Sequence, residues 1–200
     1  MVAALSKSDR TRSFIIEASS AIFNEKGYAG TSMNDLTEAT GLTKGSIYGN
    51  FQSKEDVALA VFDYNFQKVT NVIQREVDRA ETYYDKLMVY AHVYHRFSES
   101  EFPKGGCPVL NTAIEADDTK ERLKAKAANA LRSWHKNISS LLSEGTARGE
   151  FKEVINYMQL ASSIIALIEG GMMITKVTDS DDYLRQATKT IEILLQQIKI

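Results

Sequence analysis

The stretch GLTKGSIYGNF, residues 41–51, places side chains that could hydrogen-bond to phosphates and base edges on a segment that forms a helix poorly. It holds three glycines, and each glycine inside a helix costs about 1 kcal/mol relative to alanine. Ile47 and Phe51 stand four residues apart, so they would anchor one side of a short helix in a core. The other side would be lean enough for a close approach to a duplex, and it holds Gly45, Ser46, Gly49 and Asn50.

The polar residues around this segment form groups that would contact different parts of a nucleic-acid duplex, namely its phosphates, its base edges and its minor groove. Free N–H groups at a helix start favour anions. Contacts to the phosphate backbone, which set position rather than sequence, are expected from Thr31, Ser32, Thr43, Lys44, Gly45, Tyr48 and Lys54. Base edges would be read by Lys44, Ser46 and Asn50, with Tyr48 as a further candidate. Arg10 and Arg12, with Lys7, would form a basic arm that reaches a neighbouring minor groove or phosphates.

Helical periodicity runs through the whole chain and predicts an all-α protein. Three short helices come first, with Gly27 ending one and Thr31 or Ser32 capping the next. SKED, residues 53–56, predicts the start of a long helix that reaches about Arg79. Later helices are expected at about Leu87–Phe97, Leu110–Ala116, from Thr119 to a stop at Gly145 and Gly149, at Tyr157–Val177 and at Asp181–Ile198.

Three short helices with a tight turn at GLT describe a helix-turn-helix, and residues 27–57 resemble the DNA-binding domain of the TetR family of transcriptional regulators. The matching positions are Gly27, Tyr28, Thr31, Gly41, Thr43, Gly45, Tyr48, Phe51 and Lys54. The chain departs from the family pattern at Gly49 and Asn50, which affects the set of base-reading residues. The resemblance implies a DNA-binding domain at residues 1–52 and a helical ligand-binding and dimerisation domain at 53–200. It also implies a repressor that binds a pseudo-palindromic operator as a homodimer and is released by a small molecule or an electrophile.

A row of small residues on the penultimate helix bears on the dimer. Ser162, Ala166 and Gly170 recur every four residues, which would let a partner helix approach closely. The alternative is that this helix is simply buried within one subunit.

An effector pocket would be aromatic and soft. Its expected residues are Tyr64, Tyr90, Tyr94, Trp134, Met172 and Met173, with His95, Asn111 and Glu115 as polar groups. Aromatic residues at helical spacing are also typical of an ordinary core. Cys107 precedes a helix start, where a thiol pKa is lowered, so it is either an electrophile sensor or an unreactive buried residue.

Composition limits the remaining alternatives. One cysteine among 200 residues excludes an internal disulfide and favours a cytoplasmic location. The most apolar run, from Leu160, contains Glu169 and is too short to predict a membrane span. His92, His95 and His135 could bind a metal, but nothing nearby strengthens that hypothesis, so no metal or cofactor is expected. Two other function classes remain as alternatives. One is an enzyme built on Cys107, Glu115 and a histidine, and the other is an interaction protein that has lost DNA binding.

Overall fold

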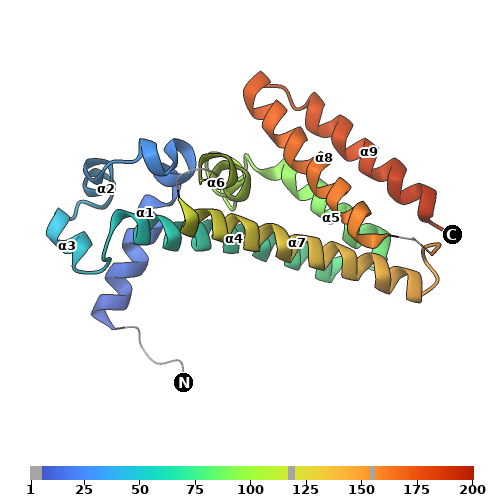
Figure 1. Cartoon of the computed structure of the whole chain (residues 1–200), viewed down its shortest axis with the longest axis horizontal. Helices are drawn as coiled ribbons and strands as arrows, with labels where there is room; N and C mark the ends of the chain where they lie inside the picture. The colour runs from blue at the N-terminus through green and yellow to red at the C-terminus, as the bar shows by residue number, and fades with distance from the viewer. Residues whose placement is uncertain (1–5, 117–119, 154–155) are drawn as a thin grey trace. The chain divides into compact units, whose positions relative to one another are not determined.

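The computed structural model describes residues 6–116, 120–153 and 156–200, and it confirms the predicted all-α fold. The helices labelled in Figure 1 are α1 (Lys7–Gly30), α2 (Met33–Thr40), α3 (Lys44–Tyr48), α4 (Lys54–Arg79), α5 (Tyr83–Val93), α6 (Pro108–Ala116), α7 (Glu121–Ala147), α8 (Tyr157–Thr178) and α9 (Asp182–Ile198). A 3₁₀ turn, Tyr94–Arg96, follows α5. The helix start predicted at Thr119 lies outside the described residues.

The chain divides into two compact units. The first unit comprises Met1–Lys68 and Pro103–Ala127, and the second comprises Val69–Phe102 and Ala128–Ile200. The first unit therefore contains α1 to α3, but also α6 and the beginnings of α4 and α7. The boundary predicted at residue 52 separates α3 from α4, whereas the first unit continues into α4.

Local sequence signals explain where the first three helices begin and end. Ser6 and Asp9 form a capping box at the start of α1, and Ser32 and Asp35 form another at the start of α2. Ser32 is thus the N-cap of α2, one of the two predicted candidates. Gly27 takes a φ of 72° and interrupts α1, and Gly41 takes a φ of 66° after α2. These left-handed conformations suit glycine because it has no Cβ.

The apolar interior of the first unit joins its helices. Ile15 of α1, Leu36 of α2, Ile47 of α3 and Val57 of α4 are fully buried together. α4 starts where SKED predicts, because the Ser53 hydroxyl accepts the Asp56 N–H at 3.1 Å. The long helix holds α2 and α3 in place, since these helices of eight and five residues are too short to be stable alone.

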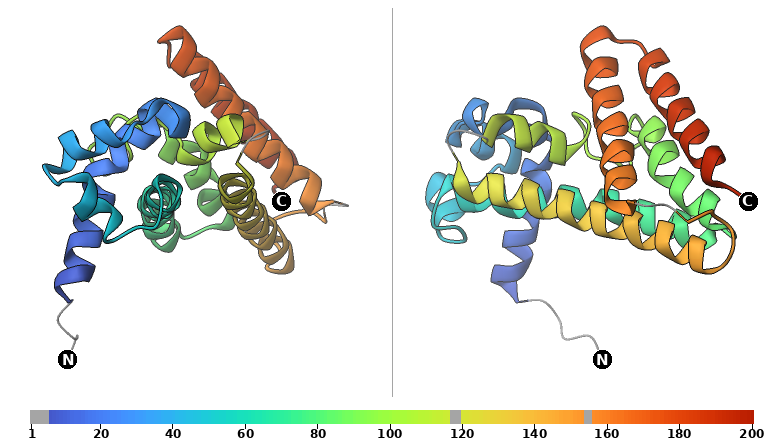
Figure 2. Two further views of the ribbon diagram at one scale, coloured as in Figure 1. Left: turned by 60° about the vertical axis from the view of Figure 1, so that its left-hand side comes forward. Right: turned by 45° about the vertical axis from the view of Figure 1, so that its right-hand side comes forward.

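The second unit is built around the antiparallel pair α8 and α9, which lie side by side in the right-hand view of Figure 2. Its fully buried side chains include Leu142, Ile164, Ile191 and Leu195. A Cβ added to Gly171 of α8 would lie 3.2 Å from the Leu184 Cα, so the two backbones approach closely there.

The predicted stop at Gly145 is wrong, because α7 continues to Ala147. Gly145 lies inside the helix, and a Cβ there would stand 2.4 Å from the Phe151 ring. Its lack of a side chain makes room for that ring. Gly149, with a φ of 77°, lies in the turn after the helix.

α8 stands out by composition. Alone among the helices in the described part of the chain, it is long and apolar enough to cross a membrane. This is weak evidence, because core helices of soluble proteins pass the same test. Ala161, Ile164 and Ile168 of α8 are buried inside the unit.

Candidate nucleic-acid interface

The inner side of α3 is anchored as its spacing predicts. The Ile47 and Phe51 side chains are buried in the core of the first unit. The Thr43 hydroxyl accepts the Ser46 N–H at 3.1 Å and caps the helix start. These contacts hold a helix of five residues that would not form in isolation.

The outer side of α3 is accessible. Lys44, Gly45 and Gly49 are exposed, Tyr48 is 48% exposed, and Ser46 is half-buried. This surface carries an ammonium, two hydroxyls and bare backbone. It therefore offers hydrogen-bond donors to phosphates and to base edges.

Asn50 is tied to its surroundings at the end of α3. Its side-chain Nδ2 donates to the Ser46 carbonyl at 2.9 Å, and the Ser8 hydroxyl lies 3.5 Å from its Oδ1. The Arg12 guanidinium donates to the Asn50 carbonyl at 2.7 Å and lies 3.9 Å above the Phe51 ring. Arg12 thus braces α1 against the end of α3. Lys7, Arg10 and Arg12, predicted as a basic arm, lie in the first turns of α1, where Arg10 is exposed.

Lys54 lies at the junction of α1 and α2. Its ammonium donates to the Tyr28 carbonyl at 2.8 Å and to the Thr31 carbonyl at 2.7 Å, and it stands 4.1 Å from the centre of the Tyr28 ring. Burial lowers its pKa, while the nearby Glu115 carboxylate acts in the opposite direction. Thr31 is also turned inward, because its hydroxyl donates to the Gly27 carbonyl at 2.6 Å. Contacts from Thr31, Ser32 and Lys54 to phosphate stay predictions.

An ion pair connects the same junction to α2. The Lys26 ammonium lies 2.7 Å from Asp35, the residue that completes the capping box of Ser32. The bond from Lys26, followed by those from Ser32, holds the pKa of the Asp35 carboxyl well below its usual range.

Part of the predicted effector pocket comes together in the second unit. Tyr90, Tyr94 and Trp134 line a cavity of about 10 Å³ together with Ile138, Ile165, Ile168 and Glu169. The rings of Tyr94 and Trp134 meet edge to face at 5.9 Å. The cavity has the space of about one water molecule, so a larger ligand would have to separate these side chains.

Four other predicted pocket residues do not line this cavity. Met172 is buried and Met173 is exposed. His95 keeps much of its surface accessible, with its Nε2 2.9 Å from the Thr188 hydroxyl. Partial desolvation by its neighbours, followed by the charge of His92, lowers its pKa. Tyr64 belongs to the first unit, where burial raises its pKa.

Cys107, Asn111 and Glu115 also belong to the first unit, on α6 and the loop that leads to it. The thiol of Cys107 is 1% exposed. Asn111 donates to the Asn24 carbonyl of α1, and Glu115 accepts the Tyr28 and Ala29 N–H groups of the same helix. Asn24 was missed by sequence reasoning. The available signal was a polar residue next to the apolar Phe23 near the end of the helix.

The metal site and the enzyme considered from the sequence have no assembled group of side chains in the described residues. Within residues 6–116, 120–153 and 156–200, no group of three or more histidine, cysteine, aspartate and glutamate side chains could hold a metal ion. Cys107 and Glu115 lie in the first unit, whereas all three histidines lie in the second.

A short helix anchored in a three-helix core, with an exposed polar outer side, defines a helix-turn-helix DNA-binding protein. Residues 15–61 match the family described as "Bacterial regulatory proteins, tetR family", and residues 84–191 match "Tetracyclin repressor-like, C-terminal domain". The chain therefore belongs to the TetR family of transcriptional regulators, whose members are DNA-binding proteins rather than enzymes.

Solved structures and a curated relative agree with this assignment. A TetR-family regulator from Cytophaga hutchinsonii is 48% identical, with a TM-score of 0.95 and 98% of both chains covered. One from Chloroflexus aurantiacus J-10-FL is 35% identical, with a TM-score of 0.91 and the same coverage. The HTH-type transcriptional repressor DhaR of Mycobacterium sp. (strain GP1) is 24% identical over 186 residues, 92% of each chain.

Proposed function

We propose that this regulator is a cytoplasmic repressor that binds a pseudo-palindromic operator as a homodimer and is released by a small molecule. The observation that carries the proposal is the exposed outer side of α3, held in position by the buried Ile47 and Phe51. The sign of regulation is taken from DhaR, which is named a repressor. No cofactor or catalytic step is part of the proposal.

Operator contact is assigned first to the residues whose side chains or backbone are accessible on and beside α3. Lys44 would neutralise a phosphate or bond to a guanine edge, and Ser46 and Tyr48 would supply hydroxyls. Asn50 would act mainly by shaping the end of α3, because its amide is bonded to its own helix. Arg10, exposed on α1, would add a phosphate contact.

Dimerisation is assigned to the outer surfaces of α8 and α9. Large apolar side chains are exposed there, namely Met158, Met173, Ile174 and Val177 on α8 and Ile193 on α9. A Cβ added to Gly170 would meet nothing within 4 Å, so that part of α8 is open to a partner helix. A two-fold protein would place two α3 helices on half-sites about 34–36 Å apart.

The effector would enter the aromatic cavity of the second unit. Tyr90, Tyr94 and Trp134 would contact its apolar part, and Glu169 is the polar group beside them. Release by a small molecule is favoured over release by an electrophile, because the Cys107 thiol is buried.

Recovery of bound DNA tests the proposal. The purified protein is incubated with fragments from the region flanking its own gene, and the retained fragments are sequenced and titrated at several salt concentrations. We expect a two-fold symmetric site, and we expect Lys44→Ala to lower affinity for all fragments and reduce the salt slope by about 1. Retention of no fragment, or an unchanged slope for Lys44→Ala, contradicts the assignment of this surface.

A further inference from the structure

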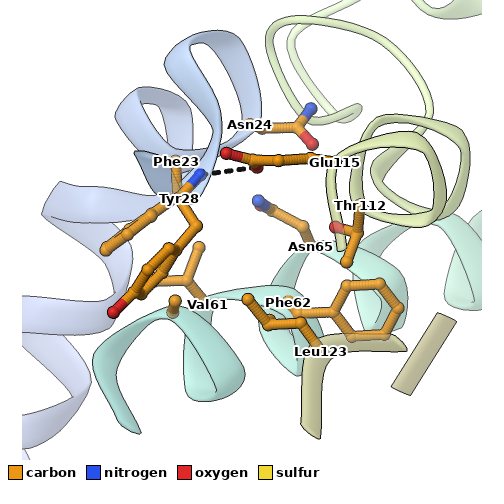
Figure 3. Close-up of a pocket in the computed structure, with 10 residues that line it drawn as sticks. Phe23, Asn24, Tyr28, Val61, Phe62, Asn65, Thr112, Glu115 and Leu123 are labelled. Atoms are coloured by element: carbon orange, nitrogen blue, oxygen red, sulfur yellow. Dashed lines mark hydrogen bonds between the residues drawn. The ribbon is translucent and has the colours of Figure 1, made fainter. Parts of the chain in front are cut away.

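α6 holds the end of α1 through a single carboxylate. The Glu115 oxygens accept the Tyr28 N–H and the Ala29 N–H, each at 2.6 Å, and Figure 3 shows the first of these bonds. The two N–H groups are available because Gly27 interrupts the helix with its positive φ. A Cβ on Gly27 would lie 2.5 Å from Glu115 Oε2, so the close approach also needs a glycine there.

A second contact lies one turn earlier on α6. The Asn111 amide donates to the Asn24 carbonyl at 3.0 Å and to the Gly105 carbonyl at 2.9 Å. The Asn24 amide in turn donates to the Lys104 and Gly106 carbonyls at 2.6 and 2.9 Å. The loop before α6 and the helix itself are thus bonded to the last turns of α1.

α4 holds the same peptide of α1 from its other side. Glu115 accepts the Ala29 N–H, while Lys54 of α4 donates to the Tyr28 carbonyl of that peptide and also to the Thr31 carbonyl. Thr31 directly precedes Ser32, the N-cap of α2. The contacts from α4 and α6 therefore hold the segment that leads directly into α2, and α2 packs with α3 in one core.

Hydrogen bonds add to apolar packing in this arrangement, since Phe23 of α1, Ala58 of α4 and Ala116 of α6 are buried in one cluster. A cavity of about 30 Å³ lies among α1, α4 and α6, next to the Glu115 carboxylate. Asn24, Asn65 and Thr112 are among the residues that line it (Figure 3). That volume accommodates about two water molecules. Because this space beside the carboxylate is not filled, loss of the Glu115 bonds would allow the end of α1 to shift toward it.

We propose that Glu115 is a positioning residue for DNA binding, which sets the junction of α1 and α2 and through it the orientation of α3. The inference rests on the proposed function, since it requires an operator that two copies of α3 read at a defined spacing. Glu115 makes no contact with DNA in this proposal.

The test compares Glu115→Gln with Glu121→Gln in the full-length protein. A glutamine has one acceptor oxygen, so one of the two N–H groups loses its partner, whereas Glu121 is an exposed carboxylate at the start of α7. Three affinities are measured, for the recovered operator, for the operator with one base pair inserted between its half-sites, and for unrelated DNA. Hydrogen exchange of the Tyr28 and Ala29 amides reports the contact itself.

We expect Glu115→Gln to bind the operator at least tenfold more weakly, to discriminate less against the inserted base pair, and to bind unrelated DNA as the wild type does. Simple loss of folded protein would lower all three affinities together. Protection of the Tyr28 and Ala29 amides should fall in Glu115→Gln only. If this variant does not fold, Glu115→Asp, one methylene shorter, is used with the same expectations.

Two negative outcomes are distinguishable. If the wild type binds its operator and Glu115→Gln matches Glu121→Gln within twofold in affinity and spacing discrimination, the positioning role is wrong and the proposed function stands. If the wild type binds no operator, the proposed function fails and the inference fails with it.

Discussion

At the scale of single residues, Lys44 and Lys54 show how similar side chains take different roles. Both are lysines near a helix start, and both are predicted to contact phosphate. Lys44 is exposed on α3, whereas Lys54 donates to two main-chain carbonyls at the end of α1. Helix position alone does not distinguish them, because the carbonyls that Lys54 binds are brought to it by the fold.

Replacing each lysine by methionine separates these roles. Lys54→Met should lower the free energy of unfolding by about 1–2 kcal/mol, because two charge-assisted hydrogen bonds at a partly solvated site are lost. Lys44→Met should leave that free energy within about 0.5 kcal/mol and reduce the salt slope of DNA binding instead. Urea unfolding measures the first effect. Equal stability of the two variants would contradict the structural role of Lys54.

The residues from Cys107 to Glu115 show what sequence can and cannot predict at this scale. Their composition marks the segment as unusual, and its helix was predicted within two residues at its start. Asn111 and Glu115 were assigned to an effector pocket, yet they bond to α1. Spacing of four residues places side chains on one face, but the partner of that face depends on tertiary packing. By contrast, Tyr90, Tyr94 and Trp134 do share one cavity.

At the scale of elements, the caps of short helices were the most predictable features. Ser32, Gly41 and Ser53 act where local chemistry requires them, because a cap depends on neighbours within four residues. The role of Gly145 was predicted wrongly because it depends on a contact outside its own helix. Its role depends on the Phe151 ring, whose position relative to α7 is not visible as a local pattern.

The cap of α2 can be tested directly. Ser32→Ala removes the acceptor of the Asp35 N–H and should cost about 1 kcal/mol of stability. Ser13→Ala, on an exposed position of α1, serves as a matched control with little effect. Thermal unfolding of both variants measures the difference, and an equal melting temperature would contradict the importance of the cap.

The lowered pKa of the Asp35 carboxyl leads us to expect that the stability supplied by the start of α2 decreases in acid. Its pKa is lowered in the folded state, so its contribution to stability is present above the unfolded pKa of about 3.9 and is lost as the pH falls further. Asp35→Asn should therefore be less stable than the wild type at pH 6, and the difference should shrink at pH 3 and below. Urea midpoints at the two pH values measure this, and a difference independent of pH would contradict it.

At the scale of the whole molecule, the main unexplained surface is the apolar one on α8 and α9. Val177 is 79% exposed and Ile193 is 52% exposed, although both follow the helical pattern that elsewhere fills a core. Sequence periodicity predicted both helices to within one residue at most ends. Which faces remain uncovered was not predictable, because periodicity marks a face as apolar but does not show what packs against it.

Ile193→Glu tests the dimer. A charge in the centre of an apolar interface should weaken association at least tenfold, about 1.4 kcal/mol, and operator affinity should fall with it. Ile114→Glu is the matched control, since Ile114 is 66% exposed on α6 of the first unit and should leave association unchanged. Sedimentation over a range of concentrations measures this. Equal association of the two variants would place the interface elsewhere.

The contact between the start of α1 and the end of α3 has a practical consequence for expression and labelling. Ser8 and Arg12 meet Asn50 within the first two turns of α1, so the start of α1 is part of the surface that would meet DNA, and a fusion tag would be joined to the chain shortly before it. A polyhistidine tag left in place would add its own charge to every titration with nucleic acid. Measurements of operator affinity therefore call for a cleaved tag.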